Sequence, residues 1–126
     1  MTPSNVAAVT RVMETYFEGL HRADSRMLRE VFHPHLSYVS ASEGDELYLD
    51  LETYMARVDR REPPAKRGEE RDEAILEIAF GEDRLARVTA RMAMMGRSYL
   101  DFLTLIRDGD DWRIVAKVFT YAAREG

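Results

Sequence analysis

The chain has 126 residues, 45% of them hydrophobic, and a formal net charge of −5. This length supplies one sizeable core and is too short for two, so we expect residues 1–126 to form a single domain. The acidic balance, without a basic patch, argues against binding to nucleic acid or to an anionic membrane. The absence of cysteine excludes disulfides, thiolate catalysis and cysteine-bound metals.

The first segment predicts an amphipathic helix. Its short apolar run, Val6–Val9, is soon interrupted by Arg11 and Glu14, so we expect neither a signal peptide nor a membrane span, and a cytoplasmic protein. Thr2–Ser4 is a suitable helix start, because a hydroxyl can cap the helix and a proline is tolerated in the first turn. One helical face is apolar, at Val9, Val12, Met13, Tyr16, Phe17 and Leu20.

Two shorter helices and two strands follow. Asp24 is placed to cap a second helix that ends before Pro34, and residues 36–40 have strand character. A polar turn then precedes a short apolar strand at residues 47–49. Asp50 is placed to cap a third helix whose apolar stripe is Leu51, Tyr54, Met55 and Val58.

The second half of the chain predicts a meander of long strands. After a charged, proline-containing connector at residues 60–71, strands are expected at 75–80 and 85–95. A final hairpin spans residues 96–121, with its turn at Asp108–Asp110. The order of elements predicts an α+β domain, with the helices on one side of a curved, mostly antiparallel sheet. Such a sheet under a long helix makes a cone that is filled by side chains or holds a ligand.

Several motifs fall on these elements: Tyr16–Leu20, Asp24, Phe32–Pro34, Asp101–Leu105, Asp108–Gly109 and Trp112–Phe119. With the element order, they resemble the NTF2-like superfamily of cone folds, and most closely the small bacterial proteins labelled "putative lumazine-binding". The likeness spans nearly the whole chain and implies the fold. It does not fix the function, because the superfamily includes isomerases, dehydratases, epoxide hydrolases, transport adaptors and many proteins of unknown role.

The final hairpin supplies the predicted pocket wall. Side-chain alternation places Asp101 on one face of the first arm and Lys117 on one face of the second. A three-residue turn would set these two residues directly opposite each other across the strands. The NTF2-like arrangement implies that the first helix covers this face. The expected ligand pocket comprises Tyr16, Tyr38, Tyr99, Asp101, Leu103, Val115, Lys117 and Phe119.

Asp101 and Lys117 support two interpretations. In the first, they are a cross-strand structural ion pair, retained because each partner would be costly to bury alone. Alternatively, Asp101 is a catalytic acid that burial and the adjacent ammonium tune in opposite directions. Tyr16 has the same two interpretations. In the structural one it is a core aromatic residue whose hydroxyl has a hydrogen-bond partner, and in the catalytic one it is a proton donor that assists Asp101.

The resemblance to the superfamily's steroid isomerases is incomplete. Those enzymes use a basic carboxylate on the first strand, a tyrosine and a protonated acid. Tyr16 matches the tyrosine, Asp101 matches the acid only with a one-residue shift, and about Ser40 stands where the base would be. Proton abstraction would therefore need His33 or Glu43 as a substitute base.

We predict no metal site and no cofactor. His33 and His35 flank Pro34, but no third ligand is evident nearby. Apolar residues also occupy the opposite faces of the hairpin, at Phe102, Thr104, Ile106, Trp112, Ile114, Ala116 and Val118. We therefore predict a homodimer formed through the outer face of the sheet.

Three functions remain open from the sequence. The preferred one is binding of a small, partly apolar molecule in the cone without transforming it, because the acid–base set is incomplete. It requires a void near Tyr16 and Lys117. The second is an isomerase or dehydratase that uses Asp101 as the acid, assisted by Tyr16 or His33. The third is a non-enzymatic dimerising module that presents a surface to another protein, which predicts a filled cone.

Overall fold

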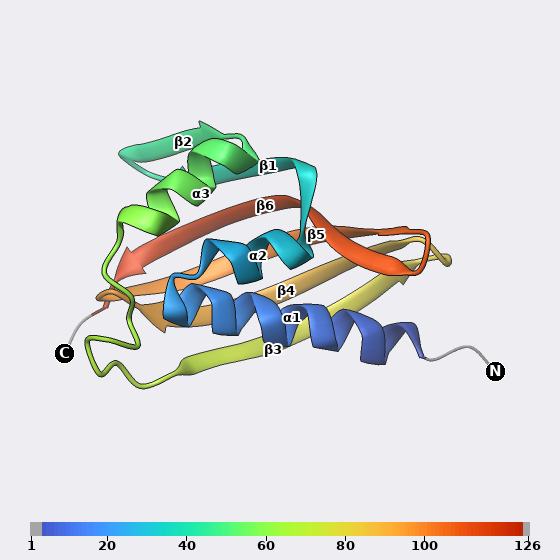
Figure 1. The fold of residues 1–126 in the computed structure, drawn as a ribbon, viewed down its shortest axis with the longest axis horizontal. Helices are drawn as coiled ribbons and strands as arrows, with labels where there is room; N and C mark the ends of the chain where they lie inside the picture. Colours follow the sequence, from blue (N-terminus) through green and yellow to red (C-terminus); the bar gives the residue numbers. More distant parts are fainter. Residues whose placement is uncertain (1–3, 125–126) are drawn as a thin grey trace.

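The computed structural model describes residues 4–124, in which three helices pack against one side of a curved six-stranded sheet (Figure 1). The helices are α1 (Asn5–Arg22), α2 (Ser25–Val31) and α3 (Leu51–Arg60). The strands are β1 (Phe32–Ser42), β2 (Asp45–Leu49), β3 (Asp72–Gly81), β4 (Leu85–Met94), β5 (Arg97–Asp108) and β6 (Asp111–Ala123). The α+β class predicted from the sequence is confirmed.

The helix boundaries follow from local capping. The Asp24 carboxylate accepts a hydrogen bond from the Met27 N–H at 3.1 Å, and the Asp50 carboxylate accepts one from the Thr53 N–H at 2.8 Å. Ser4 is the N-cap residue of α1, but its side chain makes no capping hydrogen bond. The rest of the predicted helix start, Thr2 and Pro3, lies outside the described residues. In the described part of the chain, no helix has the length and hydrophobicity needed to cross a membrane.

The sheet has the strand order β2-β1-β6-β5-β4-β3. The β1–β6 pair is parallel, and all other neighbouring pairs are antiparallel. The inner face packs under α1 and α3, and the apolar stripe of α1 lies in the core together with the inward residues of β1, β4, β5 and β6. The sheet therefore curves around one long helix, as the superfamily resemblance implied.

The register of the final hairpin differs from the prediction. Asp108 pairs with Asp111 across a two-residue turn, and a β-bulge leaves Val115 without a partner on β5. The shorter turn and the bulge each shift the register by one residue. Asp101 consequently lies opposite Phe119, and Lys117 lies opposite Leu103. Because the two shifts add to two residues, Asp101 and Lys117 still share the inner face.

Near the hairpin turn, the bulge also reverses which side chains of β6 face the core and which face outward. Trp112 and Ile114, which the sequence placed on the outer face, are buried in the core. Arg113 and Val115, placed inside by simple alternation, are only partly buried. The predicted position of Val115 in the pocket is therefore wrong, because the extra residue reverses the alternation between the turn and Ala116.

A continuous row of side chains crosses the outer face of the sheet. Register pairs connect Tyr48 to Val39, Val39 to Val118, and Val118 to Phe102. Tyr48 is 79% exposed and Phe102 is 53% exposed. This apolar row, Tyr48–Val39–Val118–Phe102, is not covered by any element within residues 4–124.

Candidate functional site

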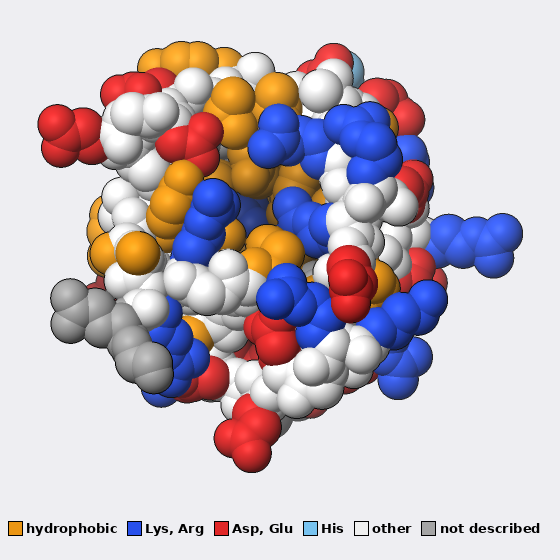
Figure 2. All heavy atoms as spheres, turned by 90° about the vertical axis from the view of Figure 1, so that its left-hand side faces the viewer, with side chains coloured by type: hydrophobic (Ala, Val, Ile, Leu, Met, Phe, Trp, Pro, Cys, Tyr) orange, Lys and Arg blue, Asp and Glu red, His pale blue; other side chains and the backbone are white. Residues whose placement is uncertain are grey.

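The cone contains a small cavity at the end of the molecule where β4 ends and β5 begins. Figure 2 shows this end, where hydrophobic side chains surround a hollow and Lys and Arg side chains gather around it. The hollow encloses about 270 Å³ when its solvent-open part is included, of which about 20 Å³ accommodates the centre of a water molecule. Its lining residues are Tyr38, Tyr54, Arg61, Met92, Met94, Tyr99, Asp101, Lys117 and Phe119.

Asp101 supplies the carboxylate of this cavity. It is only 1% exposed, and its Oδ2 atom accepts a hydrogen bond of 2.6 Å from the Tyr16 hydroxyl. Its Oδ1 atom is buried and has no hydrogen-bond partner within residues 4–124. A buried carboxylate oxygen without a donor is costly, so this atom marks a place where a donor is missing.

Lys117 supplies a buried cation to the same cavity, but it forms no ion pair with Asp101, so the direct ion pair considered from the sequence is not present. The side chain is 5% exposed, and its Nζ atom donates a hydrogen bond of 3.1 Å to the Tyr54 hydroxyl. Four aromatic rings surround the ammonium with centroids 5.0–5.7 Å away, those of Tyr16, Tyr38, Tyr54 and Phe119. A desolvated cation–π contact is worth about 2 kcal/mol or more, and such contacts help to offset the cost of burying this lysine.

The register and the helices bring these groups together. Tyr38 on β1 lies beside Lys117 on β6, and Asp101 on β5 lies beside Phe119. Tyr16 projects from α1 and Tyr54 projects from α3, so one hydroxyl reaches the carboxylate and the other reaches the ammonium. Tyr16 and Tyr54 thus cover Asp101 and Lys117 from the helical side of the sheet.

The tyrosine hydroxyls are held in the neutral form. Burial raises the pKa of Tyr16 well above its usual value, and the charge of Asp101 raises it further. Burial also raises the pKa of Tyr54, against the opposing charge of Arg61. For Tyr38, burial raises the pKa to about 12, while the charges of Lys117 and Arg61 act in the other direction. These three residues are therefore neutral hydrogen-bonding groups at physiological pH.

The family model described as "Putative lumazine-binding" matches residues 4–120. The chain belongs to this family. Its structure is also similar to an NTF2-like protein of unknown function from Silicibacter pomeroyi DSS-3, at 27% identity and a TM-score of 0.83, covering 97% of this chain and 100% of that chain.

NTF2-like proteins of unknown function from Shewanella baltica OS155 and Methylobacillus flagellatus KT share the fold at lower identity. The first is 20% identical with a TM-score of 0.83 and coverages of 96% and 98%. The second is 14% identical with the same TM-score and coverages of 98% and 96%. No curated protein matches the sequence. The comparisons thus establish an NTF2-like fold and a family, and the similar structures are described as of unknown function.

Within this NTF2-like cone, the residues predicted for the site lie in three places: behind the cavity, outside it, or in its lining. Tyr16 and Leu103 are fully buried behind the cavity, and Val115 lies outside it because of the bulge. His33 is at the surface, where its Nδ1 atom accepts a hydrogen bond from the backbone N–H of His35. It is not among the residues that line the cavity. The predicted residues that do line it are Tyr38, Tyr99, Asp101, Lys117 and Phe119.

The sequence interpretation missed Tyr54, Arg61, Met92 and Met94 as lining residues. Two signals could have identified them. Tyr54, Val58 and Arg61 follow the i, i+4, i+7 spacing of one helical face, so Arg61 continues the inward stripe of α3. The two methionines alternate with Ala93 on β4, which places both of them on the inner face.

The acid–base set considered from the isomerase resemblance is not assembled in this cavity. Asp101 is the only carboxylate among the lining residues, and its Oδ2 atom accepts the hydrogen bond from Tyr16 while its Oδ1 atom has no donor among the described residues. Ser40, at the place of the isomerase base, accepts a hydrogen bond from the Ser42 N–H. The Tyr16 hydroxyl is directed at Asp101 and does not line the cavity. The site therefore offers a buried acceptor and a buried cation.

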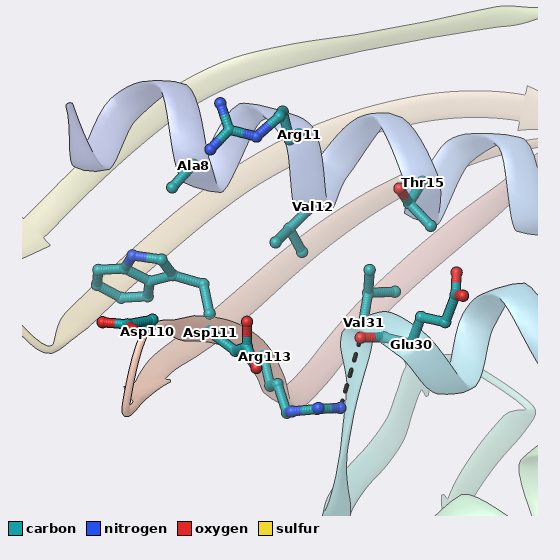
Figure 3. A pocket seen from close by; sticks show the side chains of 10 residues that line it. Ala8, Arg11, Val12, Thr15, Glu30, Val31, Asp110, Asp111 and Arg113 are labelled. Carbon is teal, nitrogen blue, oxygen red and sulfur yellow. Dashed lines mark hydrogen bonds between the residues drawn. The ribbon is translucent and has the colours of Figure 1, made fainter. Parts of the chain in front are cut away.

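A wider cleft lies at the opposite end, between α1 and the β5–β6 turn (Figure 3). With its solvent-open part included, it encloses about 850 Å³, against about 270 Å³ for the cone cavity. Arg11 and Arg113 share it with Glu30, Asp110 and Asp111, and the Arg113 guanidinium donates to the Glu30 carbonyl oxygen at 3.4 Å. In the described part of the chain, no buried polar atom lining this cleft lacks a partner. The cone cavity is therefore the stronger candidate, although it is much smaller.

Proposed function

We propose that the protein binds a small, partly apolar molecule in the cone, with the polar end of that molecule between Asp101 and Lys117. The observation that carries this proposal is the buried Oδ1 atom of Asp101, a residue that lines the cavity, because this atom has no donor from the described residues. The space of about 20 Å³ suits one water molecule, which needs about 10–15 Å³ by this measure. A ligand group that displaces this water must replace its hydrogen bonds.

The polar groups define what that end of the ligand contains. Asp101 Oδ1 requires a donor, and Lys117 offers N–H groups beyond the one directed at Tyr54. A hydroxyl or a primary amide both donates and accepts, so it satisfies the two residues together. A purely apolar group would leave the carboxylate oxygen unpaired, at a cost of about 1–3 kcal/mol.

The body of the ligand is expected to be apolar and flat. Tyr99 packs against Phe119 with ring centroids 5.9 Å apart, and Met92 and Met94 complete the wall. Methionine side chains are unbranched and flexible, so they can move apart to admit a ring between them and the aromatic residues. Such movement is required, because the enclosed space holds little more than one water molecule.

Benzamide is a suitable probe, since it joins a primary amide to a flat apolar ring. We expect it to bind and to shift the amide resonances of Asp101, Lys117 and Tyr99 in ¹H–¹⁵N NMR spectra. Toluene, which has the ring without the amide, should bind at least about tenfold more weakly, as expected for the loss of about 1.4 kcal/mol. Equal binding of the two probes, or shifts confined to another surface, would reject the proposed function.

The only other lysine provides a matched control. Lys117→Met removes the buried ammonium, and Lys66→Met makes the same change in the exposed connector. Benzamide affinity should fall in the first variant and stay unchanged in the second. If Lys117→Met does not fold, Asp101→Asn serves instead, because it keeps the shape of the side chain while removing its charge. Unchanged benzamide affinity in the folded variant would contradict the role assigned to this pair.

We also propose that two copies associate through the outer face of the sheet. The apolar row Tyr48–Val39–Val118–Phe102 crosses four adjacent strands, and Leu100 adds a further exposed apolar side chain. Contiguous apolar surface of this kind is typical of an interface between proteins. A two-fold dimer would bury the same row from both copies.

A further inference from the structure

The charge at the mouth of the cavity points to a second property of the ligand. Arg61 and Lys117 are the cations among the lining residues, and Asp101 is the carboxylate, so the wall carries two positive charges against one negative charge. The whole chain has a net charge of −5. The positive wall is therefore a local feature that opposes the overall charge, and such a site attracts an anion.

Arg61 is available for a ligand. It is the C-cap residue of α3, held by its backbone N–H to the Val58 carbonyl oxygen, so its side chain is not needed to end the helix. Within residues 4–124, its side chain has no ion-pair partner, whereas Arg22, Arg29, Arg71 and Arg91 each pair with a carboxylate.

The position of Arg61 places its charge toward the inside of the cone. It lines the same cavity as Asp101 and Lys117, and its charge acts on the buried hydroxyls of Tyr38 and Tyr54. Arg57 lies one helical turn earlier, and its charge also acts on Tyr38. Figure 2 shows Lys and Arg side chains gathered around the hollow at this end.

We infer that the ligand is an organic carboxylate whose negative group binds Arg61 at the mouth while its neutral polar group reaches Asp101 and Lys117. The inference rests on the proposed function and adds the charge of the ligand. The neutral group is assigned to the inner end, because Asp101 Oδ1 has no donor among the described residues and the Asp101 carboxylate offsets the attraction of Lys117 for an anion. The guanidinium of Arg61 matches a carboxylate in bidentate geometry, and it lies where water can still solvate the remaining oxygen lone pairs.

Two probes separate this inference from the proposed function. Benzamide tests the inner site alone, and 4-carbamoylbenzoate adds a carboxylate at the opposite end of the same ring. We expect the second probe to bind about tenfold more tightly, because charge-assisted bidentate hydrogen bonds are roughly twice as strong as neutral ones. The advantage should shrink in about 0.5 M salt, since partly exposed charges are screened.

Neighbouring residues on α3 supply the control. In Arg61→Gln, the two probes should bind equally, while Arg60→Gln, an identical change at an exposed position, should keep the full difference. Arg61→Lys keeps the charge but loses the bidentate geometry, so it should keep part of the difference.

Equal binding of the two probes to the unmodified protein would overturn the inference and leave the proposed function intact. An advantage that survives Arg61→Gln would also overturn it. Failure of both probes to bind would reject the proposed function and the inference together.

Discussion

Replacing Tyr16 by phenylalanine tests how the buried carboxylate is stabilised. The substitution removes one hydroxyl and keeps the aromatic ring, so it opens little space in the core. Tyr16 provides the hydrogen bond to Asp101 Oδ2, and Asp101 Oδ1 has no partner among the described residues. The variant therefore leaves a buried carboxylate without a donor from that part of the chain. Losing a hydrogen bond to a charged group costs about 1.5–3 kcal/mol, and we expect the free energy of unfolding to fall by that amount.

Urea denaturation at pH 7 measures this change. The single tryptophan, Trp112, is buried and reports unfolding by its fluorescence. Tyr48→Phe removes a hydroxyl from a side chain that is 79% exposed, and it should change stability by less than about 0.5 kcal/mol. If Tyr16→Phe were equally neutral, with an unchanged urea m-value, the carboxylate would not depend on Tyr16 and our account of the site would be refuted.

Three further predictions concern other parts of the molecule. Burial raises the pKa of Tyr38 to about 12 and also raises that of Tyr54, so the unfolded chain loses these two protons near pH 10 while the folded state keeps them. Their contribution to stability is constant below about pH 10 and falls by about 3 kcal/mol per pH unit between about pH 10 and pH 12, where Tyr38 also titrates in the folded state. Urea titrations of Tyr54→Phe should show a smaller slope in this range. Phe102→Asp should convert a dimer into monomers in size-exclusion chromatography with light scattering, and an unchanged oligomeric state would contradict pairing through this face. Gly19→Ala should destabilise the protein by about 1–3 kcal/mol in thermal or urea unfolding, because the added Cβ would lie 2.7 Å from Cδ2 of the buried Leu28. A gain in stability, as expected from helix propensity alone, would contradict this prediction.

Much of the fold could be predicted from short-range signals in the sequence. Asp24 and Asp50 act as caps because their carboxylates lie three residues before the N–H groups that they accept from. The register of the final hairpin could not be predicted, because Asp108–Asp110 fits either a two-residue or a three-residue turn. The bulge at Val115 is equally hidden, since β6 is apolar on both faces and alternation does not distinguish them.

The candidate site was only partly predictable for a similar reason. Asp101 and Lys117 were identifiable as polar residues within apolar strands, and a two-residue error in register keeps them on one face. Their actual contacts depend on helices that are distant in sequence. The Asp101 carboxylate binds Tyr16 of α1, and the Lys117 ammonium binds Tyr54 of α3. These contacts depend on how each helix packs across the sheet, which local patterns do not determine.

A crystal structure with bound benzamide tests the central claim most directly. We predict that the amide nitrogen lies within hydrogen-bonding distance of Asp101 Oδ1, that the amide oxygen accepts from Lys117 Nζ, and that the side chains of Met92 and Met94 have moved apart around the ring. Benzamide bound in the wide cleft between α1 and the β5–β6 turn, with the cone cavity unchanged, would contradict the claim that the cone is the ligand site.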